Sequence, residues 1–122
     1  MRIVVVDDHD SVRTILAAIL GEYGLDVVGT CANGREAVES CGRLSPDAVV
    51  MDVRMPVLDG IAATRELKAQ RPSLRVILLT AYEEEDLRTA ALAAGADDFV
   101  LKGVSGRDLA ALIRRQAPCE AA

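Results

Sequence analysis

The sequence has few aromatic residues and few lysines. Its 122 residues include no Trp, a single Phe at Phe99 and two Tyr, so a folded core must be built from Val, Leu, Ile and Ala. The lysines are limited to Lys68 and Lys102, and the formal net charge is −5. Because contacts with nucleic-acid phosphates require clustered Lys and Arg, we expect that this domain itself binds no nucleic acid.

Long hydrophobic runs and paired cysteines are also missing. No apolar run approaches the length that crosses a bilayer, and the apolar N-terminal run meets Asp7 before the core of a signal peptide could form. The three cysteines, Cys31, Cys41 and Cys119, form neither a CxxC motif nor an even disulfide framework. These absences predict a cytoplasmic protein that has no contact with a membrane.

Short β-branched runs alternate five times with segments of helical periodicity, which is typical of βα units around a parallel sheet. The predicted strands lie at about 2–6, 26–30, 47–51, 75–79 and 97–101. The helix predicted at about 60–70 has the weakest apolar pattern, and Pro72 ends it. At this length the chain fits one α/β domain with a doubly wound sheet. We expect it to occupy residues 1–116, with 117–122 as a tail or the start of a linker.

Acidic, hydroxyl and ammonium side chains stand at the predicted strand ends. Five such residues end the first, third, fourth and fifth strands: Asp7, Asp8, Asp52, Thr80 and Lys102. In doubly wound sheets the carboxyl ends of the strands meet at one edge and form the ligand site. We therefore expect these five side chains to share one site.

Three carboxylates at one edge repel each other unless a hard dication neutralises them. Mg²⁺ is the natural candidate, because it prefers oxygen ligands and is commonly held by one or two carboxylates together with a phosphate. The predicted ligands are the carboxylates of Asp7, Asp8 and Asp52. The turn after Asp52 would direct the backbone carbonyl of Arg54 into the site as a further ligand.

A carboxylate, a dication, a hydroxyl and an ammonium group are together the parts needed to move a phosphoryl group onto an aspartate. In such a transfer the metal and Lys102 offset charge on the phosphoryl oxygens, and Thr80 donates a hydrogen bond to one of them. Asp52 is the predicted phosphoacceptor, because it lies between a buried apolar strand and a turn that contains Pro.

Four motifs carry a resemblance, in this order: VVDDHDSVR, VVMDVRMPVLDGI, VILLTAYEEED and GADDFVLKG. The chain resembles the receiver domain of two-component response regulators over about residues 2–116. Its motifs are most similar to those of the nitrate-response and quorum-sensing (NarL/LuxR-type) transcription regulators. The resemblance implies a flavodoxin-like (βα)5 fold with strand order 2-1-3-4-5. It also implies a signalling switch that is not an enzyme and that a sensor histidine kinase phosphorylates.

The resemblance assigns a role to each strand-end residue by its position. Asp52 matches the phosphorylated aspartate, and Asp7 and Asp8 match the acidic pair that holds the metal. Thr80 and Lys102 match the pair that senses the phosphoryl group.

Three further positions match the family less directly. Phe99 matches the switch aromatic, which turns inward from a more exposed rotamer when Thr80 moves toward the phosphoryl group. Arg54 and Tyr82 flank the phosphoryl group in the family and are candidates for tuning dephosphorylation. The chain departs from many relatives at Phe99, which lacks their tyrosine hydroxyl, and at Gly103, which stands where a cis Pro is common. We therefore expect a trans peptide before Gly103.

The regulators with the most similar motifs carry a helix-turn-helix domain that this chain lacks. The resemblance therefore implies control of transcription through a DNA-binding domain outside this chain. It also implies a homodimer that forms on phosphorylation through the first and last helices.

Two other functions remain open. A receiver-like scaffold would keep the site, but phosphorylation would not change what it binds. A Mg²⁺-dependent phosphohydrolase with an aspartyl-phosphate intermediate would want a second Asp two residues after the nucleophile, where this chain has Arg54. His9 is best interpreted as a loop residue beside the acids, with a ligand or phosphorelay role as the alternative.

Overall fold

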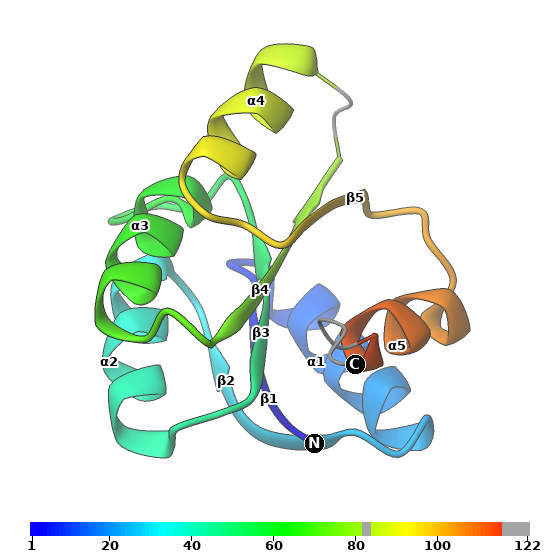
Figure 1. Ribbon diagram of the computed structural model, residues 1–122. Coiled ribbons are helices and arrows are strands. Elements are labelled where there is room, and N and C mark those ends of the chain that lie inside the picture. The colour runs from blue at the N-terminus through cyan, green and yellow to red at the C-terminus, as the bar shows by residue number, and fades with distance from the viewer. Residues whose placement is uncertain (82–83, 116–122) are drawn as a thin grey trace, which may run out of the picture.

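The computed structural model describes residues 1–81 and 84–115, in which five strands alternate with five helices (Figure 1). The strands are β1 (Arg2–Val6), β2 (Asp26–Cys31), β3 (Ala48–Asp52), β4 (Arg75–Thr80) and β5 (Asp98–Leu101). The helices are α1 (Asp10–Glu22), α2 (Gly34–Leu44), α3 (Gly60–Gln70), α4 (Glu85–Ala93) and α5 (Gly106–Arg114). The predicted βα units are confirmed, and every predicted strand boundary lies within one residue of the observed one.

The strands form one parallel sheet in the order β2-β1-β3-β4-β5, which confirms the predicted flavodoxin-like topology. Helices α1 and α5 cover one face of the sheet, and α2, α3 and α4 cover the other (Figure 1). The strand order reverses between β1 and β3, because β2 is added on one side of β1 and β3, β4 and β5 are added on the other. In a doubly wound sheet this switch point is where the carboxyl ends of the strands open a ligand site.

Both faces of the sheet are buried under helices. Val4 and Val6 of β1 pack in the cluster beneath α2, α3 and α4, whereas Ile3 and Val5 pack in the cluster beneath α1 and α5. Burial on two faces explains why β1, β3 and β4 are continuous apolar runs without alternating polar residues. The core is aliphatic, as predicted, with Phe99 as its one aromatic side chain among the described residues.

Three helices begin at a capping side chain. The Asn33 side chain accepts a hydrogen bond from the N–H of Glu36 at 2.9 Å, and the Ser105 hydroxyl accepts one from the N–H of Asp108 at 3.0 Å. Asp59 caps α3 in the same way. Each cap satisfies a helix N–H that has no partner within the helix. These caps fix the residues at which α2, α3 and α5 begin.

Helices α1 and α5 leave an apolar groove between them. Val12 and Ile15 of α1 are 38% and 58% exposed, and with Leu109 they line a cavity of about 220 Å³. A Cβ atom at Gly106 would lie 2.3 Å from Ile19, so α5 can approach α1 this closely only where it has glycine. Within the described residues, no helix has the length and apolar character that crossing a bilayer requires.

Candidate functional site

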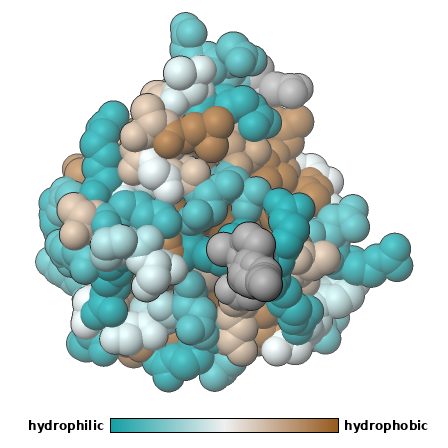
Figure 2. Space-filling view, in the orientation of Figure 1, coloured by the Kyte–Doolittle hydropathy of each residue, from teal (hydrophilic) through white to brown (hydrophobic). Residues whose placement is uncertain are grey.

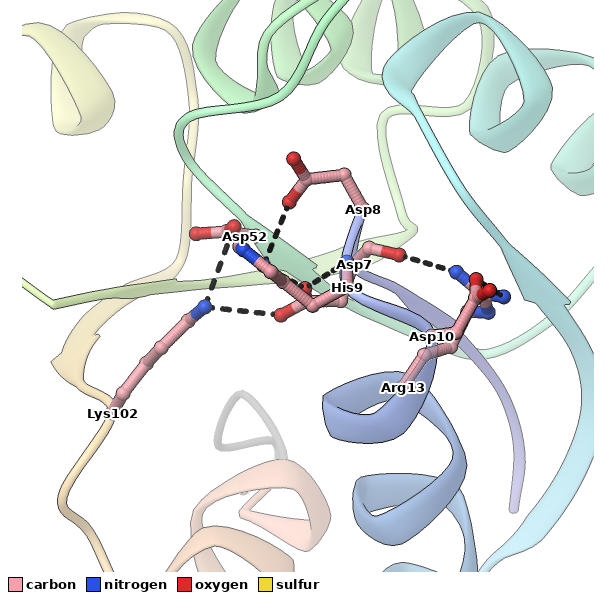
Figure 3. A network of polar contacts seen from close by, with 7 residues as sticks. All are labelled: Asp7, Asp8, His9, Asp10, Arg13, Asp52 and Lys102. Atoms are coloured by element: carbon pink, nitrogen blue, oxygen red, sulfur yellow. Dashed lines mark hydrogen bonds and ion pairs between the residues drawn. The ribbon is translucent and has the colours of Figure 1, made fainter.

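The carboxyl ends of β1, β3 and β5 bring three charged side chains into direct contact (Figure 3). Nζ of Lys102 lies 3.1 Å from Oδ2 of Asp7 and 3.3 Å from Oδ2 of Asp52. Asp7 is 1% exposed and Asp52 is 6% exposed. The ammonium group therefore lies between two buried carboxylates that come from adjacent strands, β1 and β3.

Asp7 is held by several hydrogen bonds besides the contact with Lys102. Its Oδ1 accepts a hydrogen bond from the N–H of His9 at 2.9 Å, and its backbone carbonyl accepts one from Nη1 of Arg13 at 2.8 Å. Arg13 also pairs with Asp10 in the first turn of α1. These contacts fix the loop that follows β1 and leave the second Asp7 oxygen directed at Lys102.

Asp8 provides a third carboxylate beside this pair. Its Oδ1 is buried and has no hydrogen-bond partner among the described residues, although Nδ1 of His9 lies 3.2 Å away. One ligand atom from each of Asp7, Asp8, His9 and Asp52 can be chosen so that all four lie within 4.8 Å of one another. A buried carboxylate oxygen without a donor is unusual, and a cluster rich in such oxygens fits a hard divalent cation.

Asp52 is the last residue of β3, and a glycine contact sets its backbone position. The N–H of Gly60 donates to the carbonyl of Val53 at 2.7 Å. A Cβ atom at Gly60 would lie 2.3 Å from the carbonyl oxygen of Asp52. The start of α3 can therefore pack against the end of β3 only where a side chain is absent.

Asp52 and Lys102 influence each other's ionisation. Burial raises the pKa of Asp52, the charge of Lys102 partly opposes this, and the neighbouring Asp7 raises the pKa further. Burial alone would lower the pKa of Lys102, but its hydrogen bond to Asp7 and the charge of Asp52 outweigh burial, so the pKa rises. Lys102 is thus held as a cation, and a dication at the site would favour the ionised form of Asp52.

A cavity of about 180 Å³ opens above Asp52. It is lined by His9, Asp52, Arg54, Thr80, Ala81 and Lys102. The cavity is smaller than the sites that take drug-sized ligands, so it fits a small polar group rather than an organic substrate. Thr80, the last residue of β4, is buried at its wall.

A larger cavity of about 380 Å³ lies at the opposite edge of the sheet, near Asp47 and Arg75. Its one carboxylate, Asp47, already accepts a hydrogen bond from the N–H of Arg2 at 2.7 Å. Because Asp7, Asp52 and Lys102 lie together at the other edge, we assign the chemistry to the smaller cavity.

The structure also places the remaining predicted residues. Nη2 of Arg54 lies 3.3 Å from Oε1 of Glu84, and Tyr82 lies outside the described residues. Phe99 is buried, so it occupies the inward one of the two positions that the resemblance implies. All described peptide bonds are trans, including the bond before Gly103, as predicted.

Two contacts were missed by the sequence analysis. They are the Arg54–Glu84 ion pair and the position of Arg88 over the Phe99 ring. Each joins residues that are at least ten positions apart, and neither shows in a local motif.

Comparison with known proteins gives the family. The sequence profile of the response regulator receiver domain matches residues 3–114. Response regulator GacA of Pseudomonas viridiflava is 40% identical over 115 residues, which are 93% of this chain and 54% of that protein. Response regulator protein VraR of Staphylococcus saprophyticus is 36% identical over 116 residues, which are 94% of this chain and 56% of that protein.

A solved structure agrees with these relatives. The signal receiver domain of NarL from Mycobacterium tuberculosis superposes with a TM-score of 0.88 at 31% identity, covering 92% of this chain and 91% of that chain. The chain spans about half the length of the curated relatives it matches. The chain therefore belongs to the response regulator receiver domain family of two-component systems.

Proposed function

We propose that Asp52 accepts a phosphoryl group from a phosphohistidine of a sensor histidine kinase. The observation that carries this proposal is the contact of one ammonium group, Lys102 Nζ, with both Asp7 and Asp52 beside a small cavity that Thr80 also lines. In the transfer, an Asp52 carboxylate oxygen bonds to phosphorus while the phosphorus–nitrogen bond of phosphohistidine breaks. The imidazole keeps the electron pair and takes up a proton.

Mg²⁺ is the proposed cofactor. The carboxylates of Asp7, Asp8 and Asp52 and the backbone carbonyl of Arg54 would hold the ion, which when bound offsets the charge of the phosphoryl oxygens. The oxygen-rich cluster and the buried Oδ1 of Asp8, which accepts no hydrogen bond from the described residues, support this choice.

Thr80 and Lys102 are the proposed sensors of the phosphoryl group, and Phe99 is the residue that carries the change to the surface. A hydrogen bond to a charged group contributes about 1.5–3 kcal/mol, which shifts a population by roughly one to two powers of ten. Phosphorylation therefore biases an equilibrium between two conformations. Figure 2 shows brown apolar patches over α4 and beside it on a largely teal face, and Leu92 of α4 and Leu101 of β5 are exposed large hydrophobic residues.

The output proposed for the full protein is control of transcription through a DNA-binding domain outside this chain. The relatives' greater length is consistent with a further domain. The apolar groove that Val12 and Ile15 line between α1 and α5 is the proposed contact with a second phosphorylated copy.

The phosphoacceptor is tested by incubating the protein with Mg²⁺ and acetyl phosphate and weighing it by intact mass spectrometry. We expect one added phosphoryl group, none in Asp52→Asn, and one in Asp26→Asn, whose carboxylate is at the opposite edge of the sheet. Phosphorylation of Asp52→Asn would show that the acceptor is another residue.

The scaffold alternative is tested by sedimentation with and without beryllofluoride, which mimics the bound phosphoryl group. A switch should change its monomer–dimer equilibrium, and Ile15→Asp should prevent that change. An equilibrium that beryllofluoride leaves unaltered would favour the scaffold.

A further inference from the structure

An ion pair joins the two loops at the mouth of the Asp52 cavity. Nη2 of Arg54, in the loop after β3, lies 3.3 Å from Oε1 of Glu84, in the loop before α4. Arg54 also lines the cavity together with Asp52 and Lys102. Both side chains of the pair are more than half exposed, at 58% and 52%. The pair therefore lies where an anion entering the cavity from solvent would meet the Arg54 guanidinium.

Glu84 has a second possible role at the start of α4. It is the residue that precedes the helix, and its carbonyl accepts a hydrogen bond from the N–H of Arg88 at 3.0 Å. Its side chain makes no capping hydrogen bond, although a carboxylate at a helix N-terminus interacts favourably with the helix dipole. The carboxylate that could cap α4 is paired with Arg54 instead.

We propose that Glu84 is a positioning residue that competes with the phosphoryl group of Asp52 for Arg54. This inference rests on the proposed function. Phosphorylation replaces a carboxylate of charge −1 by a group of charge about −2, and a guanidinium binds phosphate oxygens through paired donors. Arg54 then exchanges Glu84 for the phosphoryl oxygens, and the released Glu84 carboxylate is free to cap α4.

This exchange would connect the phosphorylation site to α4 by a route separate from Thr80 and Phe99. The route begins in the loop after β3 and ends at the first turn of α4. It runs through the side chains of Arg54 and Glu84, so a side-chain replacement at either position tests it while Asp52, Lys102 and the metal-binding carboxylates stay unchanged.

The test is a titration of the protein with beryllofluoride in the presence of Mg²⁺, followed by ¹⁹F NMR of the bound fluorides. Glu84→Gln keeps the shape of the side chain but removes its charge. We expect it to lower the half-saturating beryllofluoride concentration about two- to fivefold, which corresponds to one exposed ion pair. Arg54→Met should raise that concentration.

A matched control and a double variant separate the ion pair from a general effect of charge. Glu85→Gln removes the same charge one residue further along, and we expect a smaller change than for Glu84→Gln. In the Arg54→Met background, Glu84→Gln should have no effect. Equal changes for the two glutamates, or a Glu84→Gln effect that persists without Arg54, would overturn the inference.

The titration also distinguishes failure of this inference from failure of the proposed function on which it rests. If the unaltered protein failed to bind beryllofluoride, the result would contradict both the proposed function and this inference. If the unaltered protein bound beryllofluoride and Glu84→Gln left the half-saturating concentration unchanged, only this inference would be contradicted. Urea unfolding of each variant shows whether it is folded, and both side chains are exposed enough for replacement to leave the core unchanged.

Discussion

The guanidinium carbon of Arg88 lies 5.2 Å from the centre of the Phe99 ring, and its Nη2 donates to the carbonyl of Phe99 at 3.4 Å. One side chain of α4 therefore contacts both the ring and the backbone of a buried β5 residue. A cation over an aromatic face is attracted by the ring quadrupole. Arg88 thus stabilises the buried position of the Phe99 ring.

Replacing Arg88 should make the outward position of Phe99 more populated. A cation–π contact at an exposed site contributes about 0.5–1 kcal/mol, so Arg88→Met should raise the outward population by about two- to fivefold. Phe99 is the single Phe of the sequence, and labelling with 4-fluorophenylalanine therefore gives one ¹⁹F resonance to follow.

Arg88→Lys is the matched control, because it keeps a cation that can lie over the ring. Its spectrum should resemble that of the unaltered protein more closely than the Arg88→Met spectrum does. Identical spectra for Arg88→Met and the unaltered protein would show that Arg88 has no influence on the position of Phe99.

Removing the Asp52 charge should stabilise the metal-free protein. Burial raises the pKa of Asp52 in the folded state, so the folded protein holds this proton more tightly than the unfolded chain does. Stability is therefore lost as the pH rises from the ordinary value of 3.8 through the folded-state pKa. At pH 7 the full penalty is present, so Asp52→Asn should raise the free energy of unfolding.

The difference in the free energy of unfolding between Asp52→Asn and the unaltered protein should narrow as the pH is lowered toward 3.8, the ordinary pKa of Asp. Urea unfolding of both proteins in EDTA at several pH values measures it. Asp26→Asn, in an exposed position at the start of β2, should show no such narrowing. A constant advantage for Asp52→Asn at every pH would mean that ionisation of Asp52 is not the cause.

Addition of Mg²⁺ should stabilise the fold through the acidic cluster. A ligand that binds only the folded state at ten times its Kd adds about 1.4 kcal/mol to the free energy of unfolding. Thermal unfolding in Mg²⁺ and in EDTA should show this gain for the unaltered protein and for Asp10→Asn, but not for Asp8→Asn. Equal gains in all three proteins would place the ion elsewhere.

Val57 has a strained backbone, and replacing it should increase stability. Its φ is 70°, a region that β-branched residues rarely adopt, and its side chain is 79% exposed. The N–H of Leu58 donates across it to the carbonyl of Pro56 at 2.7 Å. Val57→Gly relieves about 1–3 kcal/mol of strain against the larger entropy of an unfolded Gly, so we expect a net gain of about 1 kcal/mol.

Urea unfolding measures the effect of Val57→Gly, with Val57→Ala as the comparison. Alanine keeps a Cβ atom at positive φ and should recover less stability than glycine. Loss of stability in Val57→Gly would show that the turn does not strain the folded protein.

The fold and the position of the site were predictable because both depend on local patterns. Continuous apolar runs such as that of β3 mark strands that are buried on both faces, and capping residues such as Asn33 mark helix starts. Parallel strands place their carboxyl ends at one edge, so Asp52 and Lys102 could be assigned to one site before their contact was known.

Contacts between side chains of different elements were not predictable from those patterns. Arg88 meets Phe99, and Arg54 meets Glu84, only because the fold brings together elements that are distant in the sequence. The exposure of Val12 and Ile15 has the same origin, since helical spacing does not say how wide a stripe the neighbouring elements cover.

The position of Lys102 between Asp7 and Asp52 means that the pocket carries an internal counter-ion. A newly made chain can assemble this edge of the sheet before any divalent ion arrives, because one of its own side chains offsets the repulsion. A metal ion that bound there would redistribute positive charge within a pocket that is already assembled, so the fold at this edge of the sheet would not depend on the ion.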